Sequence, residues 1–400
     1  MIAAEQGEGE GEDRLQRFRR WMAQLDPAGD PARAFAAGLY LSYPRAVSQR
    51  IAARLEIAPA STHLLIGGVG SGKSTELLAV KQRLARRTTD TRILYLDVSK
   101  GHDIAKVAPG VVIVQVGLAL APPEDERDED EQYAVRTLRH LAEGYDAHPP
   151  DYDDNDGSFH VPGILHPPDR FTDEVVTARD AVQTLRGSQT NLVVLIDGLD
   201  RMTNLSAFER VVINDVAALT KDGIGVVLVG PLRSLYGIDH ATTQRFDESH
   251  YQPWIDQSSS PEVSEFLQHV LRKRLPQEAI GDRELDNLAY FSGGVLRDLV
   301  ALAQLACLEA YMGDSDTIGP EQVNTAIDTF GRNHMQGLRK TDLDVLERVR
   351  KTGSFVHTSD DDLALLMTRR VLEYRHDGRP RYVVHPTINQ FLGDMLAETS

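Results

Sequence analysis

Residues 67–75 read Gly67-Gly68-Val69-Gly70-Ser71-Gly72-Lys73-Ser74-Thr75, and this stretch decides the fold of the chain. The apolar run His63–Ile66 before it predicts a strand, and the apolar spacing of Ser74–Arg86 after it predicts a helix. Glycines let backbone N–H groups turn inward where a side chain would collide, and the N-terminus of a helix attracts the same anion. A strand, a glycine loop and a helix in this order predict a phosphate-binding site.

The spacing Gly67-x4-Gly72-Lys73-Ser74 matches the Walker A pattern of nucleotide-binding proteins. In that pattern Lys73 reaches the β and γ phosphates, and the Ser74 hydroxyl binds Mg²⁺. Thr75 begins the helix and is expected to contact the α phosphate. A glycine-rich turn that matches by chance is the alternative, and the strand and helix on either side argue against it. We therefore expect residues 67–75 to bind a nucleoside triphosphate together with Mg²⁺.

An apolar strand that ends in an acid, Val193–Asp197, supplies the second half of the predicted site. Asp197 is expected to hold Mg²⁺ directly or through water. A further strand, Arg92–Val98, is predicted between the two motifs. It indicates the class of nucleoside triphosphatases that has an extra strand between these motifs and usually activates water. That class normally carries a glutamate directly after the aspartate. Here the position is Gly198, and the next acid is Asp200.

The segment Asp197-Gly198-Leu199-Asp200-Arg201 resembles the NACHT and KAP-like members of the STAND ATPases, in which the more distal acid is thought to serve. This resemblance implies that Asp200 orients the attacking water. The alternative is that Asp200 pairs with Arg201 or caps a helix. With glycine at position 198 we expect slow hydrolysis, which suits a switch better than a motor.

Three arginines are candidates to act on the γ phosphate, by resemblance to AAA+ and STAND proteins. Arg233 follows the predicted strand Val226–Val229, where that group places a polar or basic sensor. Arg245 precedes the predicted fifth strand, the place of the AAA+ arginine finger, which can be worth about 10³–10⁵ in rate. Arg297 is the last residue of a Gly-x-x-Arg motif at the start of a predicted helix. It resembles the sensor-2 residue of AAA+ lids. An ordinary surface arginine is the alternative for each, and only one of Arg233 and Arg245 need be functional.

Residues from about 45 to 400 resemble the AAA+/STAND superfamily of P-loop NTPases. The lid and C-terminal half look most like the origin-recognition initiator ATPases, and the Asp197 segment looks most like NACHT and KAP proteins. The resemblance implies an α/β fold with a parallel sheet, a helical lid and a C-terminal winged helix. No guanine-selecting Asn/Thr-Lys-x-Asp follows a strand, because Thr220-Lys221-Asp222-Gly223 has the wrong order. ATP is therefore expected as the nucleotide, and not GTP.

The sequence predicts four parts in chain order: residues 1–45, 46–258, 259–338 and 339–400. The first is an acidic tail with a helical segment, and the second is the five-stranded ATPase core. The third is a lid of four helices separated by Gly and Pro, and the fourth is a winged helix of two helices and a hairpin. Within the core, residues 122–170 predict a long, mobile acidic loop. Residues 104–121, rich in valine and interrupted by Pro109-Gly110, fit a helix or a strand.

The chain has 400 residues and a formal net charge of −17. Its hydrophobic fraction of 41% is in the range of soluble globular proteins. Most of this charge lies in three acidic stretches, 1–13, 124–131 and 151–156, so it says little about the folded surfaces. The longest apolar run, Val111–Ala121, is too short to cross a bilayer, and the single cysteine, Cys307, excludes an intrachain disulfide. We expect a cytoplasmic protein without membrane contact.

Two further metal signals are weak. Asp151–Asp156 resembles the start of an EF-hand calcium loop, but Asp156 stands where glycine is needed and Pro162 where glutamate is needed. His148, His160 and His166 share that loop without helical spacing and without cysteine, so no zinc site is expected there.

The sequence favours an ATP-driven conformational switch, in which Arg297 closes the lid over ATP and Mg²⁺ and hydrolysis resets it. The expected partners are ATP and ADP, further copies of the chain, and a separate effector or sensor protein, with bacterial defence or signalling as the analogy. The alternative is a DNA-binding initiator or loader that grips DNA through the winged helix. Residues 341–400 carry ten acids and eight bases, so DNA binding is open but not favoured. A small-molecule phosphotransferase is a third hypothesis, and no acceptor site supports it.

Overall fold

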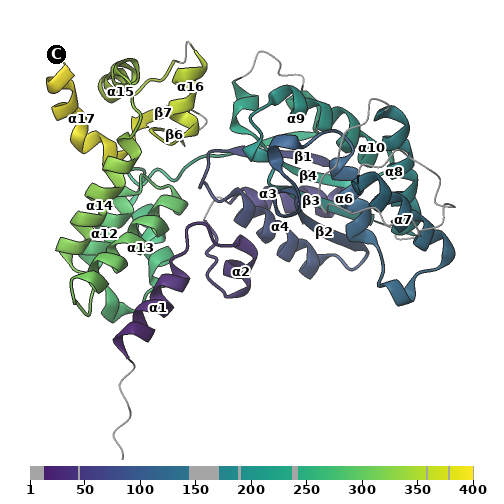
Figure 1. The fold of residues 1–400 in the computed structure, drawn as a ribbon, viewed down its shortest axis with the longest axis horizontal. Coiled ribbons are helices and arrows are strands. Elements are labelled where there is room, and N and C mark those ends of the chain that lie inside the picture. The colour runs from purple at the N-terminus through teal and green to yellow at the C-terminus, as the bar shows by residue number, and fades with distance from the viewer. Residues whose placement is uncertain are drawn as a thin grey trace, which may run out of the picture. The chain divides into compact units, whose positions relative to one another are not determined.

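The computed structural model describes residues 13–43, 46–143, 171–187, 191–236, 242–356, 359–376 and 379–399. The chain divides into two compact units (Figure 1). We name them the sheet unit, Ser42–Gly67 with Gly72–Gln252, and the helical unit, Met1–Leu41 and Gly68–Ser71 with Pro253–Ser400. The change of unit at Pro253 lies close to the predicted boundary at 258. The grouping of the N-terminal segment with the helical unit was not predicted.

Five strands form the sheet: β1 (Thr62–Gly67), β2 (Thr91–Asp97), β3 (Asn191–Asp197), β4 (Gly225–Gly230) and β5 (Glu248–Gln252). Their order is β2-β3-β4-β1-β5, and every neighbouring pair is parallel. Strand β4 lies between β1 and β3 in the sheet, whereas the strand predicted between the two motifs in the sequence, Arg92–Val98, is the edge strand β2. Parallel neighbours require crossover connections, and helices supply them. The predicted α/β P-loop fold is confirmed.

One face of the sheet packs against α3 (Val47–Ile57) and α4 (Lys73–Arg87). Ile51 of α3 and Leu77 of α4 belong to a buried cluster with Leu65 of β1. On the other face the Phe208 ring of α9 approaches Leu64 and Gly230. Both faces of the strands are thus covered, which explains why they read as continuous apolar runs. The other helices of this unit are α5 (Val98–Gly101), α6 (Val111–Leu120), α7 (Glu129–Glu143), α8 (Phe171–Arg186), α9 (Leu205–Val211) and α10 (Ala217–Lys221).

Two regions of the sheet unit differ from the simplest sequence prediction. The ambiguous valine-rich stretch is helix α6, which is 10 residues long. Part of the predicted loop 122–170 is wrong, because Glu129–Glu143 forms helix α7. Its buried residues Ala134, Val135 and Leu138 have helical spacing, and its acidic first turn favours a helix N-terminus. Residues 144–170, with the EF-hand-like stretch and the three loop histidines, lie outside the described residues. No helix in the described part of the chain combines the length and the apolar character that crossing a bilayer needs.

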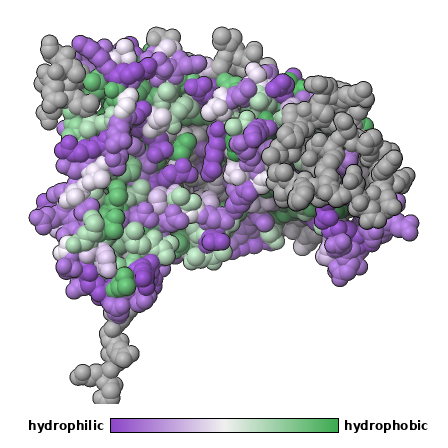
Figure 2. Space-filling view, viewed as in Figure 1, coloured by the Kyte–Doolittle hydropathy of each residue, from purple (hydrophilic) through white to green (hydrophobic). Residues whose placement is uncertain are grey.

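The helical unit contains the predicted lid and winged helix. The lid consists of α11 (Pro261–Arg272), α12 (Asp282–Phe291), α13 (Leu296–Met312) and α14 (Pro320–Met335). The winged helix consists of α15 (Lys340–Thr352), α16 (Asp360–Met367), β6 (Val371–His376), β7 (Arg379–Val384) and α17 (Pro386–Thr399). Strands β6 and β7 pair antiparallel, which confirms the predicted hairpin, while α17 was not predicted. In the view of Figure 2 hydrophilic surface predominates, with smaller apolar patches between.

The N-terminal helices α1 (Arg14–Gln24) and α2 (Pro31–Ala36) belong to the helical unit, where α1 contacts α13. The Arg14 guanidinium donates to the carbonyls of Ala310, Tyr311 and Ser315, at 3.2, 2.9 and 3.0 Å. These carbonyls lie at and beyond the C-terminal end of α13, where helix carbonyls lack backbone partners. The helical part of the predicted N-terminal segment therefore stabilises the end of a lid helix.

A buried carboxylate fixes the start of α6. Asp215, which is fully buried in a π-helical turn (Val212–Val216), accepts hydrogen bonds from three backbone N–H groups. The donors are Gly110 at 2.6 Å, Val112 at 2.9 Å and Ile113 at 3.3 Å. These N–H groups have no partner within the helix, so Asp215 acts as a cap supplied by a distant segment.

We predict that Asp215→Ala lowers the free energy of unfolding by about 3 kcal/mol, because it leaves several buried N–H groups unsatisfied. Urea denaturation of both proteins measures the difference. Asn214→Ala is the matched control, since its side chain bonds only to the Arg210 carbonyl and should change stability little. Equal stability of the Asp215→Ala and Asn214→Ala proteins would contradict the capping role.

Candidate nucleotide-binding site

The predicted phosphate loop joins β1, which ends at Gly67, to α4, which begins at Lys73. Gly70 and Gly72 have φ angles of +80° and +93°, which glycine adopts without strain. Because α4 starts directly after the loop, the first N–H groups of the helix and the positive end of its dipole lie there. The local geometry is that of an anion-binding loop.

The Lys73 side chain is buried and lies between a carbonyl and a carboxylate. Its Nζ donates to Gly67 O at 2.9 Å and lies 2.9 Å from Asp200 Oδ2. Asp200 stands on a short 3₁₀ turn, Leu199–Arg201, that follows β3. The structure therefore brings the Walker A lysine and the displaced acid into direct contact, within the part of the site that the sequence assigned to the γ phosphate.

Asp197, at the end of β3, has an exposed fraction of only 3%. The Tyr95 hydroxyl donates to its Oδ2 and the Gly198 N–H donates to its Oδ1, both at 2.8 Å, and the Ser74 hydroxyl also bonds to this carboxylate. Burial raises the pKa of Asp197, and the Asp200 carboxylate raises it further, while the hydrogen bonds oppose the shift. The oxygen donors of Ser74 and Asp197 thus meet, and oxygen donors are the ligands that Mg²⁺ prefers. These two residues fit the predicted Mg²⁺ site.

The glycine that replaces the usual glutamate has a structural cause. Gly198 has a φ angle of +90°, and a Cβ added there would lie 2.7 Å from Asp97 Oδ1 and 2.9 Å from the Ser99 N atom. Any larger residue would have to displace the end of β2. The next acidic residue after Asp197 therefore stands beyond this turn, at Asp200.

Sequence reasoning missed two residues of this site, Tyr95 and Asp97. In the parallel pairing of β2 and β3, Tyr95 lies opposite Leu195 and Asp97 lies opposite Asp197. Asp97 accepts hydrogen bonds from the backbone and hydroxyl of Ser99, which shape the turn that Gly198 approaches. Both residues lie in the predicted strand Arg92–Val98, but the sequence did not show which strand pairs with it.

The three candidate arginines occupy different elements. Arg233 is half-buried on a 3₁₀ turn after β4, and Arg245 is exposed at the end of a 3₁₀ turn before β5. Arg297 is exposed in the first turn of α13, in the helical unit. Their roles toward the γ phosphate stay predictions.

The tip of the phosphate loop, residues 68–71, packs within the helical unit. Gly68 lies against the Trp254 ring, where an added Cβ would come within 1.9 Å of a ring carbon, and Trp254 Nε1 donates to Val69 O at 3.1 Å. An added Cβ at Gly70 would lie 2.8 Å from a Val295 methyl group and 2.9 Å from the Cβ of Arg297. The loop tip thus touches the segment that carries the predicted sensor-2 arginine.

No protein-family model and no curated protein matches this chain. Among solved structures, it is similar to the Aeropyrum pernix ORC2 protein in ADPNP and ADP complexes, with 14% identity and a TM-score of 0.47, over 89% of this chain and 96% of that one. The A. pernix ORC1 protein in complex with DNA matches with 12% identity and a TM-score of 0.47, over 95% and 98%. The Thermotoga maritima RuvB Holliday junction branch migration motor matches with 14% identity and a TM-score of 0.42, over 87% and 94%.

The resemblance of the Asp197 segment to STAND, NACHT and KAP proteins stays a prediction.

We predict that Tyr95→Phe raises the Mg²⁺ concentration needed for half-maximal nucleotide binding by about 10-fold, because a hydrogen bond to a carboxylate is worth about 1.5–3 kcal/mol. Losing this donor moves the already raised pKa of Asp197 higher, so protons compete better with Mg²⁺ as the pH falls. The defect should therefore be larger at pH 6 than at pH 8, in a titration with a fluorescent nucleotide.

Tyr133→Phe, which alters an exposed tyrosine of α7, is the control and should behave as the wild type. A Tyr95→Phe defect of equal size at both pH values would argue against the link to the Asp197 carboxyl group.

Proposed function

We propose that this chain binds Mg²⁺-ATP and hydrolyses it, and that its nucleotide state is passed to the lid and winged helix. The observation that carries the proposal is the cluster at the phosphate loop: Lys73 beside Asp200, and Ser74 bonded to the buried Asp197. This set supplies a cation for the phosphates, two oxygen ligands for a divalent ion and a second carboxylate near the transferred group.

Each side chain has a separate task in the proposed reaction. Lys73 exchanges its contact with Asp200 for the β and γ phosphate oxygens, which leaves the Asp200 carboxylate available to orient a water molecule. Asp197 and Ser74 hold the metal ion, which neutralises the charge that develops on the phosphates. Because Asp200 reaches the site from a 3₁₀ turn and not from the end of β3, we expect slow turnover.

A continuous series of contacts in the helical unit supports coupling to the winged helix. The loop tip touches Val295 and Arg297, and the next residue, Asp298, is buried. Asp298 Oδ2 accepts from Arg369 Nε at 2.9 Å and lies 3.5 Å from His385 Nε2. Burial opposes its ionisation, but the His385 hydrogen bond and the Arg369 charge hold the pKa of Asp298 below its usual value. A movement of the phosphate loop would therefore act on a charged connection to the winged helix.

The winged-helix arginines bear on the DNA-binding alternative. Four of the five arginines that cluster around the hairpin make contacts within the helical unit. The contacts are Arg369 with Asp298, Arg370 with the carbonyls of His334 and Gln336, Arg375 with Glu373, and Arg381 with Asp256. These side chains would have to leave their partners to bind phosphates, which weighs against them as a ready DNA surface.

The two outputs considered are a STAND-type switch, which acts through self-assembly or a separate protein, and a DNA-binding initiator. The names among the similar solved structures match the second, and one of those proteins is in complex with DNA. An initiator-type ATPase is therefore the second candidate function, and DNA binding is the measurement that separates the two outputs.

We expect Lys73→Ala to abolish ATP binding, because it removes the cation at the phosphates, and Asp200→Ala to retain binding while lowering turnover by at least about 100-fold. Isothermal titration with ATP and single-turnover hydrolysis measure the two properties separately. Glu209→Ala, in α9, is the control and should retain both. Turnover by Asp200→Ala at the wild-type rate would exclude Asp200 as the water-orienting acid, and normal ATP affinity in Lys73→Ala would exclude the nucleotide site.

For DNA, we expect binding only at low salt and its loss by about 200 mM. The reason is that few basic side chains of the winged helix are available to neutralise phosphates and so release counterions from the DNA. Fluorescence anisotropy with duplex DNA, in ATP and in ADP, measures this dependence. Arg379→Ala removes an exposed arginine at the start of β7. Tight binding at 200 mM salt that Arg379→Ala weakens would establish the initiator function.

A further inference from the structure

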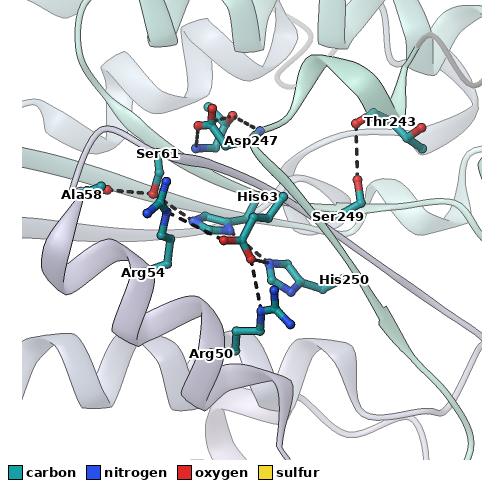
Figure 3. Close-up of polar contacts among 11 residues, drawn as sticks. Arg50, Arg54, Ala58, Ser61, His63, Thr243, Asp247, Ser249 and His250 are labelled. Atoms are coloured by element: carbon teal, nitrogen blue, oxygen red, sulfur yellow. Dashed lines mark hydrogen bonds and ion pairs between the residues drawn. The ribbon is translucent and has the colours of Figure 1, made fainter. Parts of the chain in front are cut away.

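A second cluster of polar side chains lies in the sheet unit, on β1 and β5. In their parallel pairing His63 stands opposite Glu248, and Leu65 stands opposite His250. Paired residues of parallel strands point to the same face of a sheet, and Leu65 packs in the cluster formed with α3 and α4. His63, Glu248 and His250 therefore converge on the α3 face of the sheet. Figure 3 shows the rings of His63 and His250 close together there.

This cluster is separate from the nucleotide site. His63 stands near the beginning of β1, whereas the phosphate loop follows the end of that strand at Gly67. At about 3.3 Å per residue the two positions are roughly 13 Å apart along the strand. None of the residues assigned to the phosphates or to Mg²⁺ belongs to the cluster.

The ligand atoms of the three side chains lie at metal-binding distances. His63 Nδ1 is 3.0 Å from His250 Nε2, and His250 Nε2 is 3.8 Å from Glu248 Oε2. All three atoms lie within 4.8 Å of one another. Ligands at about 2.0–2.1 Å from a tetrahedral ion are roughly 3.3 Å apart, so small side-chain rotations would seat one ion between them.

Hydrogen bonds set His63 in the form that a metal needs. The Ser61 hydroxyl donates to Ala58 O at 2.7 Å and therefore accepts from His63 Nε2–H at 2.9 Å. This places the proton on Nε2 and leaves the Nδ1 lone pair directed at His250. Histidines that bind metals characteristically donate their other N–H to such an outer partner. The Ser61 hydroxyl thus holds the His63 ring in the orientation that metal binding needs.

Burial favours the neutral form of both histidines. Burial, with a smaller effect of the His250 ring, lowers the pKa of His63 to about 4, and burial also lowers the pKa of His250. Neutral imidazole is the form that binds metal ions. His250 would bind through Nε2 by moving its ring proton to Nδ1, which changes no net charge.

The charges around the cluster leave one ligand accessible to solvent. Arg50 Nε donates to Glu248 Oε2 at 3.2 Å, and Arg54 Nε lies 3.8 Å from Oε1. The backbone N–H and the hydroxyl of Thr62 both donate to the Asp247 carboxylate. The Glu248 side chain is 26% exposed, while both histidines are buried. An ion can therefore enter from the side of Glu248. Arg50 and Arg54 orient the Glu248 carboxylate, and their positive charges disfavour binding of more than one cation.

We propose that His63, His250 and Glu248 bind one Zn²⁺ ion, with water in the fourth position. Two neutral imidazoles and one carboxylate are a donor set that Zn²⁺ takes, whereas Mg²⁺ and Ca²⁺ prefer oxygen ligands alone. The ion fastens β5, an edge strand, to the interior strand β1. Only two residues separate β5 from the turn Thr243–Arg245, and Ser249 Oγ donates to Thr243 O at 3.3 Å. The ion therefore also steadies the segment that carries Arg245.

Equilibrium dialysis of the full chain against Zn²⁺ without nucleotide, with the bound metal measured by atomic absorption, tests this proposal. One tightly bound Zn²⁺ per chain is expected. His63→Gln and His250→Gln should each weaken binding by more than about 100-fold, and Ser61→Ala by about 10–100-fold as an outer partner does. Zn²⁺ should raise the Tm of the wild type but not that of His250→Gln.

Two variants serve as controls and should retain Zn²⁺. His102→Gln removes another buried histidine of the sheet unit, and Asp197→Asn removes the predicted Mg²⁺ ligand. If a histidine variant fails to fold, Glu248→Gln, at a partly exposed position, replaces it, and the visible spectrum of bound Co²⁺ reports whether the site is tetrahedral. A wild type that retains no Zn²⁺, or a loss of Zn²⁺ in Asp197→Asn equal to that in His250→Gln, would overturn the site and leave a hydrogen-bonded histidine pair.

Discussion

The parallel pairing of β2, β3, β4 and β1 is the constraint on which the candidate site depends. Parallel strands align their carboxyl ends at one edge of the sheet, so the loop after β1 and the acids at the ends of β2 and β3 meet there. Asp197 is held by a hydroxyl from β2 and another from α4, and Lys73 meets the acid that follows β3. A change of one residue in the β2–β3 register would turn Tyr95 to the other face and remove this arrangement.

Close packing at Gly198 also explains why no acid stands directly after the strand that ends in Asp197. Gly198 cannot carry a side chain beside Asp97 and Ser99, so the chain turns first and presents Asp200 from the 3₁₀ turn. Glycine at position 198 and the acid at position 200 therefore belong to the same turn after β3. The glycine lets the chain turn beside β2, and the turn carries Asp200. The slow hydrolysis that we propose rests on this displaced acid.

The helical unit has a comparable dependence on one buried carboxylate. Asp298 follows the predicted sensor-2 arginine and pairs with Arg369 and His385 of the winged helix, so the lid and the winged helix share one charged contact. Removing one partner of such a pair leaves a buried charge without compensation, which costs more than the pair contributes. Asp298, which carries this contact, is the next residue in the chain after Arg297. The zinc-binding cluster, by contrast, lies at the opposite end of β1 and can act on strand β5 without the nucleotide.

The sequence by itself determined the elements whose signals are local. The phosphate loop, the strand that ends in Asp197, the four lid helices and the hairpin each depend on glycines, prolines and apolar spacing within one short segment, and the structure has all of them. Helix α7 was missed because the acids around it suggested a loop, while its buried residues Ala134, Val135 and Leu138 gain their stability only from packing. Tertiary structure alone decided the contacts between distant segments: Lys73 with Asp200, Tyr95 with Asp197, and His63 with His250. The physical reason is that strand order and register place residues that are far apart in sequence side by side, and no local pattern carries that information.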